Sequence, residues 1–304
     1  MDSADEVRAH LNVLHEAVWE LAAIAVALRD PPTADPEQHR AADHVLVEAG
    51  LMEESADGAW PAPGLVEAVG ADRSGLAAQA ATGILQSAGV LSGASTWSSQ
   101  DDEALLAQGR GSAQMAAPFK AFGVPMMKGL GDLLATSSVM LDVGVGVAAM
   151  AVAFCQAFPH LRVVGLDVVP RALALARRTV DQACMADRIE LRHQDVATVD
   201  DTDAFCLAWL PAPFVPRSAI DAGLPRLVTA LVPGGWLVLG HGKFHDGRLS
   251  NALTRFQTVA FGGTALDGDE AQDLLRTIGL ERVSTMPTPE GAPGITVGQR
   301  VVRS

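Results

Sequence analysis

The stretch that decides the fold is Val139-Met140-Leu141-Asp142-Val143-Gly144-Val145-Gly146-Val147-Ala148. An apolar run ends in an acid, a glycine turn follows, and residues 149–158 then resemble a helix, which predicts the order strand, turn, helix. The first glycine permits a sharp turn, and the second lets the backbone approach a ligand closely. The N-terminal N–H groups of the helix are available to whatever binds at this turn.

A second predicted strand, residues 162–166, ends at Asp167. An acid at the tip of the second strand is placed to bind the two hydroxyls of a ribose. The two strands therefore predict a site for a cofactor that contains a nucleoside.

Strands and helices alternate from residue 137 onward, which predicts an α/β fold. We expect a Rossmann-like, mostly parallel, seven-stranded sheet with helices on both faces. The last two strands have no helix between them, so they should form a hairpin that makes one strand antiparallel. The predicted strands are 139–143, 162–166, 188–192, 203–209, 235–240, 280–286 and 295–302, and the predicted helices are 148–158, 170–184, 218–231 and 268–278.

The N-terminal part of the chain is predicted to be mainly helical and similar to a winged helix. Residues 3–6 have the spacing of a capping box, and a heptad-like apolar stripe follows them. Asp35-Pro36 starts a second helix that stops at Gly50, and residues 51–60 predict a hairpin around an Asp-Gly turn. The stripe suits either a core helix or a helix that forms a dimer. It consists of Val7, Leu11, Leu14, Val18, Leu21, Ala25 and Leu28.

Three further helices are predicted at 74–88, 99–107 and 121–134, with a break at residues 109–112. The last of them carries a Met-rich apolar face, which suits either plain core or the adaptable wall of a substrate pocket. We place a domain boundary between residues 1–120, a dimerising or substrate-covering domain, and residues 121–304, the cofactor domain.

Composition restricts the partners and the compartment. The formal net charge of −14 argues against nucleic acid or an anionic membrane surface as a partner. No apolar run reaches the roughly 18 residues of a membrane span, and the acidic start is unlike a secretory signal. The three cysteines show no metal spacing, which predicts free thiols in the cytoplasm and no metal site.

Two cofactor fingerprints overlap on the glycine turn. Gly144-x-Gly146-x-x-Ala149 with Asp167 fits a dinucleotide site, but the acid at Asp142 would repel a pyrophosphate. The same acid suits the ammonium group of a bound amino acid. Two more features follow: Asp195, after the third strand, can accept the exocyclic amine of an adenine, and Pro-Gly-Gly at 233–235 directly precedes a strand.

On these four motifs, residues 139–240 resemble class I S-adenosylmethionine-dependent methyltransferases, and residues 1–135 are similar to the dimerisation part of small-molecule O-methyltransferases. The resemblance implies a homodimer that methylates a small, largely apolar molecule and releases S-adenosylhomocysteine. It implies that Asp142, Gly144 and Gly146 hold the methionine part of the cofactor. The implied ribose site is Asp167 with Val168, the implied adenine site is Asp195 with Val196, and Trp209 completes the cofactor site. The expected substrate residues, between the sheet edge and the helical part, are Phe122, Met126, Met127 and Phe214, with Trp209 nearby.

Two departures from the family pattern affect this interpretation. Ala148 replaces the third glycine, and no histidine lies directly after the fourth strand, where plant-like O-methyltransferases carry their catalytic base. Displacement at a sulfonium depends mainly on alignment and desolvation, so a base is not strictly required. The candidates for one are His241, Lys243 and His245 after the fifth strand, and we choose His241 because it lies nearest the strand end.

Alternative functions stay open. The accepting atom is expected to be oxygen, with nitrogen or carbon as alternatives. The missing histidine also allows a non-methylating reaction of the same cofactor, such as a decarboxylation or a rearrangement. A nicotinamide-dependent oxidoreductase is disfavoured by Asp142, and a DNA-binding regulator is disfavoured by the acidic balance of the chain.

Overall fold

The computed structural model of the protein describes residues 3–29, 35–55, 58–62, 65, 73–91, 97, 102–136, 138–242, 248–260, 262–288 and 293–301. The chain divides into two compact units, Met1–Ser92 and Gly93–Ser304. None of the helices in the described part of the chain is long and apolar enough to cross a membrane.

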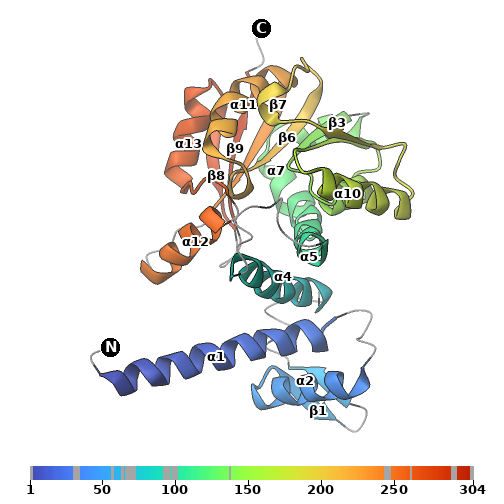
Figure 1. Ribbon diagram of the computed structural model, residues 1–304. Coiled ribbons are helices and arrows are strands. Elements are labelled where there is room, and N and C mark those ends of the chain that lie inside the picture. The colour runs from blue at the N-terminus through green and yellow to red at the C-terminus, as the bar shows by residue number, and fades with distance from the viewer. Residues whose placement is uncertain are drawn as a thin grey trace. The chain divides into compact units, whose positions relative to one another are not determined.

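The N-terminal unit has the predicted order of helix, helix and hairpin (Figure 1). The capping box is present: the Ser3 hydroxyl accepts from the amide of Glu6, and the Glu6 carboxylate accepts from the amide of Ser3, both at 3.2 Å. Asp35 caps the second helix, with Pro36 in its first turn. The elements are α1 (Ala4–Ala27), α2 (Pro36–Glu48), the antiparallel pair β1 (Met52–Ser55) and β2 (Gly58–Pro61), and α4 (Arg73–Leu91).

Helix α1 is buried only near its C-terminal end. Ala23 and Ala27 pack with α2 in a small apolar cluster, and Leu28, directly after α1, is also buried. The earlier part of the heptad-like stripe is exposed. The side chains from Val7 to Leu21 in this stripe are 42–57% exposed. Within the described part of one copy of the chain, the stripe from Val7 to Leu21 is therefore not a core face.

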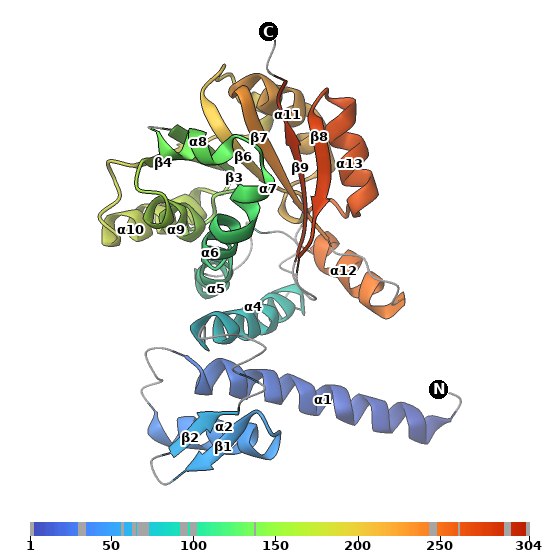
Figure 2. The ribbon, with the colours of Figure 1, turned by 180° about the vertical axis from the view of Figure 1, so that it is seen from behind.

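The C-terminal unit contains the predicted seven-stranded sheet, in the order β5-β4-β3-β6-β7-β9-β8 (Figures 1 and 2). The first five strands pair in parallel, and β9 is antiparallel to both β7 and β8, which confirms the predicted hairpin. The strands are β3 (Ser138–Val143), β4 (Leu161–Asp167), β5 (Ile189–His193), β6 (Phe205–Pro211), β7 (Leu231–His241), β8 (Glu281–Met286) and β9 (Gly294–Gln299).

Helices cover both faces of the sheet, as alternating elements require. One apolar cluster joins the sheet to α9 (Ala149–Ala157) and α10 (Pro170–Gln182), and another joins it to α11 (Arg217–Ala230) and α13 (Gly268–Thr277). A helix that the sequence did not predict, α12 (Arg248–Ala260), precedes α13. Two 3₁₀ turns, η3 (Val196–Thr198) and η4 (Ala212–Phe214), follow β5 and β6.

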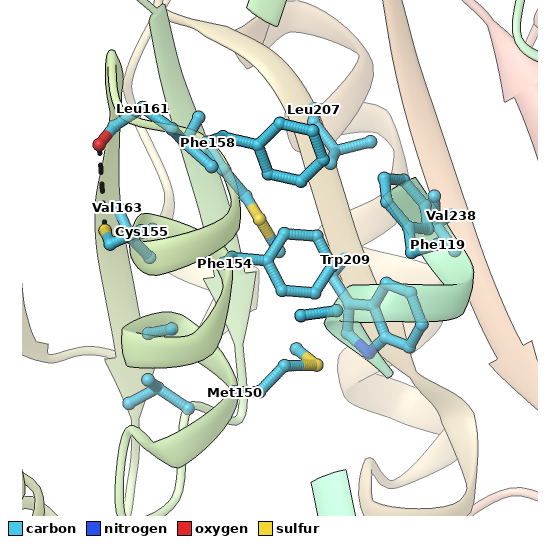
Figure 3. Packing of buried hydrophobic residues seen from close by; sticks show 14 of the residues in the cluster. Phe119, Met150, Phe154, Cys155, Phe158, Leu161, Val163, Leu207, Trp209 and Val238 are labelled. Carbon is cyan, nitrogen blue, oxygen red and sulfur yellow. Dashed lines mark hydrogen bonds between the residues drawn. The ribbon is translucent and has the colours of Figure 1, made fainter. Parts of the chain in front are cut away.

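Aromatic rings form the centre of the first cluster (Figure 3). Phe119 contacts Phe154 at 5.1 Å and Trp209 at 6.3 Å between ring centroids. Phe154 also lies 6.0 Å from Phe158, and the Cys155 thiol donates to the carbonyl of Leu161 beside it. Burial raises the pKa of the Cys155 thiol to about 11, so this thiol is an inert part of the core.

The segment before the sheet differs from the prediction in two places. The predicted break at 109–112 is wrong, because α5 (Asp102–Ala113) continues through these residues. The predicted single helix over 121–134 is also wrong. Pro125 lacks the amide N–H that a regular helix uses, and Gly129 has φ +82°, so the chain forms short pieces instead. These are α6 (Ala116–Pro118), the π-helix η2 (Phe119–Gly123), α7 (Val124–Met126) and α8 (Leu130–Ala135).

The compact units divide earlier in the chain than the boundary predicted after residue 120. Helix α5 packs on α9 and α10, so it belongs to the same unit as the sheet. The functional division at residue 120 stays a prediction.

Candidate cofactor site

The glycine turn after β3 has a left-handed backbone at three of its residues. Gly144, Gly146 and Ala148 have φ values of +67°, +56° and +62°. The turn lies against the end of β4, where the amide of Val145 donates to the carbonyl of Leu166 at 2.8 Å. Gly165 in β4 makes this approach possible, because a Cβ there would lie 2.6 Å from a methyl carbon of Val145. The sequence signal for Gly165 is a glycine inside a strand.

Ala148 adopts the conformation that favours glycine, and its replacement tests the turn. Ala148→Gly relieves about 1–2 kcal/mol of backbone strain. It also removes a buried methyl group and adds chain entropy to the unfolded state, each an effect of about 1 kcal/mol. We therefore expect urea unfolding to give a free energy of unfolding within about 1 kcal/mol of the wild type. Ala148→Val should lose at least about 2 kcal/mol, since a β-branched residue tolerates positive φ poorly. Equal stability of the two variants would contradict the described turn.

Asp167, at the end of β4, joins the two loops of the site. Its Oδ2 accepts from the amide of Gly146, and its Oδ1 accepts from the amide of Val169, both at 2.8 Å. Burial raises the pKa of Asp167, while these amide donors act in the opposite direction. Each carboxylate oxygen has more than one acceptor position, so the group can still bind hydroxyl donors of a ligand.

Asp142 is a buried acid near the carboxyl end of β3. Asp142 is only 1% exposed, and its Oδ2 has no hydrogen-bond partner within the described structure. Burial raises the pKa of Asp142 to about 8, and the nearby charge of Asp167 acts in the same direction. A buried carboxyl without a donor is an unstable arrangement unless a ligand supplies one. The site therefore fits a ligand with a positively charged donor group.

The remaining predicted cofactor residues follow the same edge of the sheet. Trp209 pairs with Asp142 across β6 and β3, but its ring belongs to the aromatic core. Asp195 is exposed and caps η3 through a 2.8 Å bond from the amide of Ala197. Val168 is exposed beside Asp167, and Val196 is buried. Parallel pairing places these residues at the carboxyl ends of β3, β4, β5 and β6, where open α/β sheets bind ligands.

The predicted substrate residues lie in different surroundings. Phe122 is 72% exposed on η2 and Met126 is half-exposed, whereas Met127 is buried in the core cluster and lines no open surface. Phe214 stacks on Trp97, with 5.2 Å between the ring centroids. The sequence interpretation missed Trp97, because no local pattern indicates a contact over that distance along the chain.

His241 is buried at the end of β7, and both of its ring nitrogens have partners. Nδ1 lies 2.7 Å from the carbonyl oxygen of Gly242, and Nε2 lies 3.0 Å from the hydroxyl of Thr296. A carbonyl only accepts, so Nδ1 carries the proton and Nε2 accepts from Thr296. Burial lowers the pKa of His241, which matches this neutral form. These two hydrogen bonds explain how the buried ring of His241 is satisfied, and its role as a base stays a prediction. Lys243 and His245 lie outside the described residues.

Comparison with known proteins identifies the domain. Residues 140–235 match the family model described as a methyltransferase domain. The release factor glutamine methyltransferase of Geobacter sulfurreducens is 27% identical over 149 residues, which are 41% of this chain and 51% of that protein. The carboxy-S-adenosyl-L-methionine synthase of Chromohalobacter salexigens is 27% identical over 47% of this chain and 62% of that protein. The chain thus spans about half the length of these curated relatives.

Solved structures resemble a larger part of the chain. An O-methyltransferase family protein from Burkholderia thailandensis superimposes with a TM-score of 0.67 at 17% identity, over 100% of both chains. Human N-acetylserotonin methyltransferase, solved in complex with S-adenosylmethionine, gives a TM-score of 0.58 at 15% identity, over 99% of both chains. The likeness at this identity is one of fold. Residues 140–235 therefore form a methyltransferase domain within a class I methyltransferase fold.

Proposed function

We propose, starting from the methyltransferase domain at residues 140–235, that the protein moves a methyl group from S-adenosylmethionine to an oxygen of a small, largely apolar molecule. The observation that carries this proposal is the buried Asp142 carboxyl, whose Oδ2 has no partner within the described structure. An amino-acid ammonium group supplies the missing donor and favours the charged carboxylate, whereas a pyrophosphate has only acceptor oxygens and offers no donor. The positive-φ glycines directly after Asp142 leave the backbone open to the same ligand.

The residues at the sheet edge divide the cofactor between them. Asp142 and the Gly144–Gly146 backbone would hold the methionine part, and Asp167 with Val168 would hold the ribose. Asp195 and Val196 would hold the adenine, with Trp209 behind the site. S-adenosylmethionine supplies a methyl group on a sulfonium, and its product S-adenosylhomocysteine carries a neutral thioether.

The protein contributes alignment and exclusion of water more than proton transfer. No histidine directly follows β6 in the sequence. Both ring nitrogens of His241 already have partners, the Gly242 carbonyl and the Thr296 hydroxyl. Apolar side chains near the sheet edge suit an apolar acceptor, and the stacked rings of Trp97 and Phe214 are the surface we assign to it. Holding an acceptor in line with an activated methyl group can contribute several kcal/mol to catalysis.

Two structural neighbours support a small acceptor and an oxygen atom. One is an O-methyltransferase family protein, and another is N-acetylserotonin methyltransferase. The net charge of −14 supports a small molecule over a nucleic acid. The relative that synthesises carboxy-S-adenosylmethionine favours a second candidate, a reaction of the same cofactor without methyl transfer.

Isotope-labelled cofactor separates these two candidates. S-adenosylmethionine with a trideuterated methyl group is incubated with the protein and a panel of small hydroxylated aromatic compounds, and products are analysed by mass spectrometry. We expect a heavy methyl group in the acceptor and an equal amount of S-adenosylhomocysteine. An acceptor that is consumed while the cofactor keeps its methyl group would establish the second candidate instead.

The exposed stripe of α1 supports a homodimer through the N-terminal unit, because apolar heptads of this length bury themselves against a second helix. We expect sedimentation velocity to give a dimer for the wild type and a monomer for Leu11→Glu/Leu14→Glu. Val13→Glu is the matched control, since Val13 is exposed on the same helix but lies off the stripe. A wild-type monomer would refute the dimer, and dissociation by Val13→Glu would refute the stripe as its interface. A cytoplasmic location stays a prediction that rests on the unpaired cysteines.

A further inference from the structure

One apolar cluster includes residues of the two segments that form the cofactor site, the glycine turn after β3 and the segment after β4. It brings together Leu105 of α5, Val147 of the glycine turn, and Val169, which follows the end of β4. Val147 is adjacent to Gly146, whose amide donates to Asp167, and the amide of Val169 donates to the same carboxylate. Packing in this cluster therefore sets the positions of the glycine turn and of Asp167 together. Ala172 and Leu175 of α10 complete its buried part.

Helix α5 approaches the glycine turn closely at Gly109. A Cβ at this buried position would lie 2.2 Å from Cγ2 of Val147 and 3.4 Å from Cβ of Ala149. Contacts below 3.0 Å essentially never occur for a real Cβ, so one of the two segments would have to move. Val147 is buried and its branched side chain is stiff at χ1, so rotation offers little relief.

Glycine is a poor residue for a helix interior, and its presence here has a structural reason. The sequence suggested a helix break at this point, but α5 is continuous. Gly111, two residues later in the same helix, has no atom within 4 Å of a Cβ built at its position. The close approach is therefore a property of Gly109 and not of glycines in α5 generally.

We propose that Gly109 is a positioning residue for cofactor binding, because it lets α5 lie directly on Val147 and hold the glycine turn in its binding conformation. This inference rests on the proposed function, whose cofactor it concerns. It extends the cofactor site beyond the methyltransferase domain of residues 140–235, since α5 precedes that domain. A half-exposed ion pair of 2.6 Å between Asp102 and Arg171 ties the start of α5 to α10 next to the same cluster.

The test compares the two glycines of α5 by calorimetric titration with S-adenosylmethionine. We expect Gly109→Ala to raise the dissociation constant on the order of tenfold or more. Gly111→Ala should leave the dissociation constant unchanged, because its methyl group meets open space. Val147→Ala removes the atom that the new methyl group would strike. The dissociation constant of Gly109→Ala/Val147→Ala should therefore return to that of Val147→Ala alone.

Amide hydrogen exchange of residues 144–148 in the cofactor-free protein provides a second readout. Gly109→Ala should accelerate exchange in this turn, Gly111→Ala should not, and Val147→Ala should suppress the acceleration. Unchanged exchange and unchanged affinity in Gly109→Ala would overturn the inference, as would a loss of affinity that Val147→Ala fails to rescue. A wild-type protein that does not bind S-adenosylmethionine would count against the proposed function, while the exchange data would still decide whether Gly109 positions the turn.

Discussion

Asp142→Asn is expected to stabilise the cofactor-free protein near pH 7.5 and, in the same variant, to remove most of its affinity for S-adenosylmethionine. The two effects have one cause, which is a carboxyl group buried without a donor for its Oδ2. The amide of asparagine has nearly the same shape and no charge to bury. Folding of the variant therefore carries no free-energy cost for burying an ionisable acid, but the asparagine offers no negative charge to an ammonium group.

The pH dependence of stability gives the sign of the first effect. The ordinary pKa of an aspartate is 3.8, and burial raises that of Asp142 to about 8. Between these values the folded protein retains a proton that the unfolded chain has released, so stability falls as the pH rises. The limiting slope is about 1.4 kcal/mol per pH unit, and it vanishes above about pH 8. Urea unfolding between pH 5 and pH 8 should show that the free energy of unfolding of the wild type falls as the pH rises. In Asp142→Asn, the contribution of Asp142 to this fall should be absent.

The second effect is the loss of a buried charge partner. Removing one member of such a pair typically weakens binding by about 2–5 kcal/mol, which is at least thirtyfold in the dissociation constant. Asp221→Asn is a matched control, because Asp221 is half-exposed on α11 and pairs with Arg217 away from the site. In Asp221→Asn, neither the free energy of unfolding nor the dissociation constant for S-adenosylmethionine should change much. An Asp142→Asn variant that binds the cofactor normally would contradict the assignment of Asp142.

Asp167→Ala is expected to weaken both folding and cofactor binding, in contrast to Asp142→Asn. The carboxylate of Asp167 satisfies the amides of Gly146 and Val169, and each buried amide without an acceptor typically destabilises by about 1–3 kcal/mol. Release of the buried charge offsets part of this loss. We expect urea unfolding to show a net loss of about 2 kcal/mol. Calorimetry should show a rise of at least about a hundredfold in the dissociation constant for S-adenosylmethionine, since the ribose acceptor is gone.

Asp167→Asn is the informative intermediate. Its Oδ1 can still accept from Val169, but its NH₂ group faces the amide donor of Gly146, so one of the two bonds is lost. Stability should therefore lie between the wild type and Asp167→Ala. Asp181→Ala, an exposed change on α10, controls for the loss of a carboxylate. If Asp167→Ala binds the cofactor with unchanged affinity, the ribose does not lie at the end of β4.

The parts of the fold that depend on local patterns could be predicted from the sequence. The capping box at Ser3, the Asp35-Pro36 helix start and the glycine turn each rest on a few adjacent residues with a known backbone preference. The strands of the sheet could be predicted because buried parallel strands are short apolar runs separated by helical segments. The hairpin of β8 and β9 followed from the absence of a helix between them.

The parts that depend on tertiary packing could not be predicted. The glycines of α5 indicated a break, but packing of Gly109 on Val147 outweighs its poor helix propensity. The sequence indicated that His241 lies at a strand end, as it does in β7, yet periodicity could not show that its ring would bond to Thr296 on another strand. The stacking of Trp97 on Phe214 and the burial of Met127 likewise join segments that no local pattern connects.

The most direct test of the proposed function is a calorimetric titration of the purified protein with S-adenosylmethionine at pH 7, in two buffers of different ionisation enthalpy, with NADH titrated in parallel. At this pH the Asp142 carboxyl of the free protein holds a proton, because its pKa is about 8. An ammonium group beside it favours the carboxylate, so binding should release up to about one proton. We predict tight binding of S-adenosylmethionine with proton release that disappears in Asp142→Asn, and no heat from NADH. Tight binding of NADH with no response to S-adenosylmethionine would contradict the account.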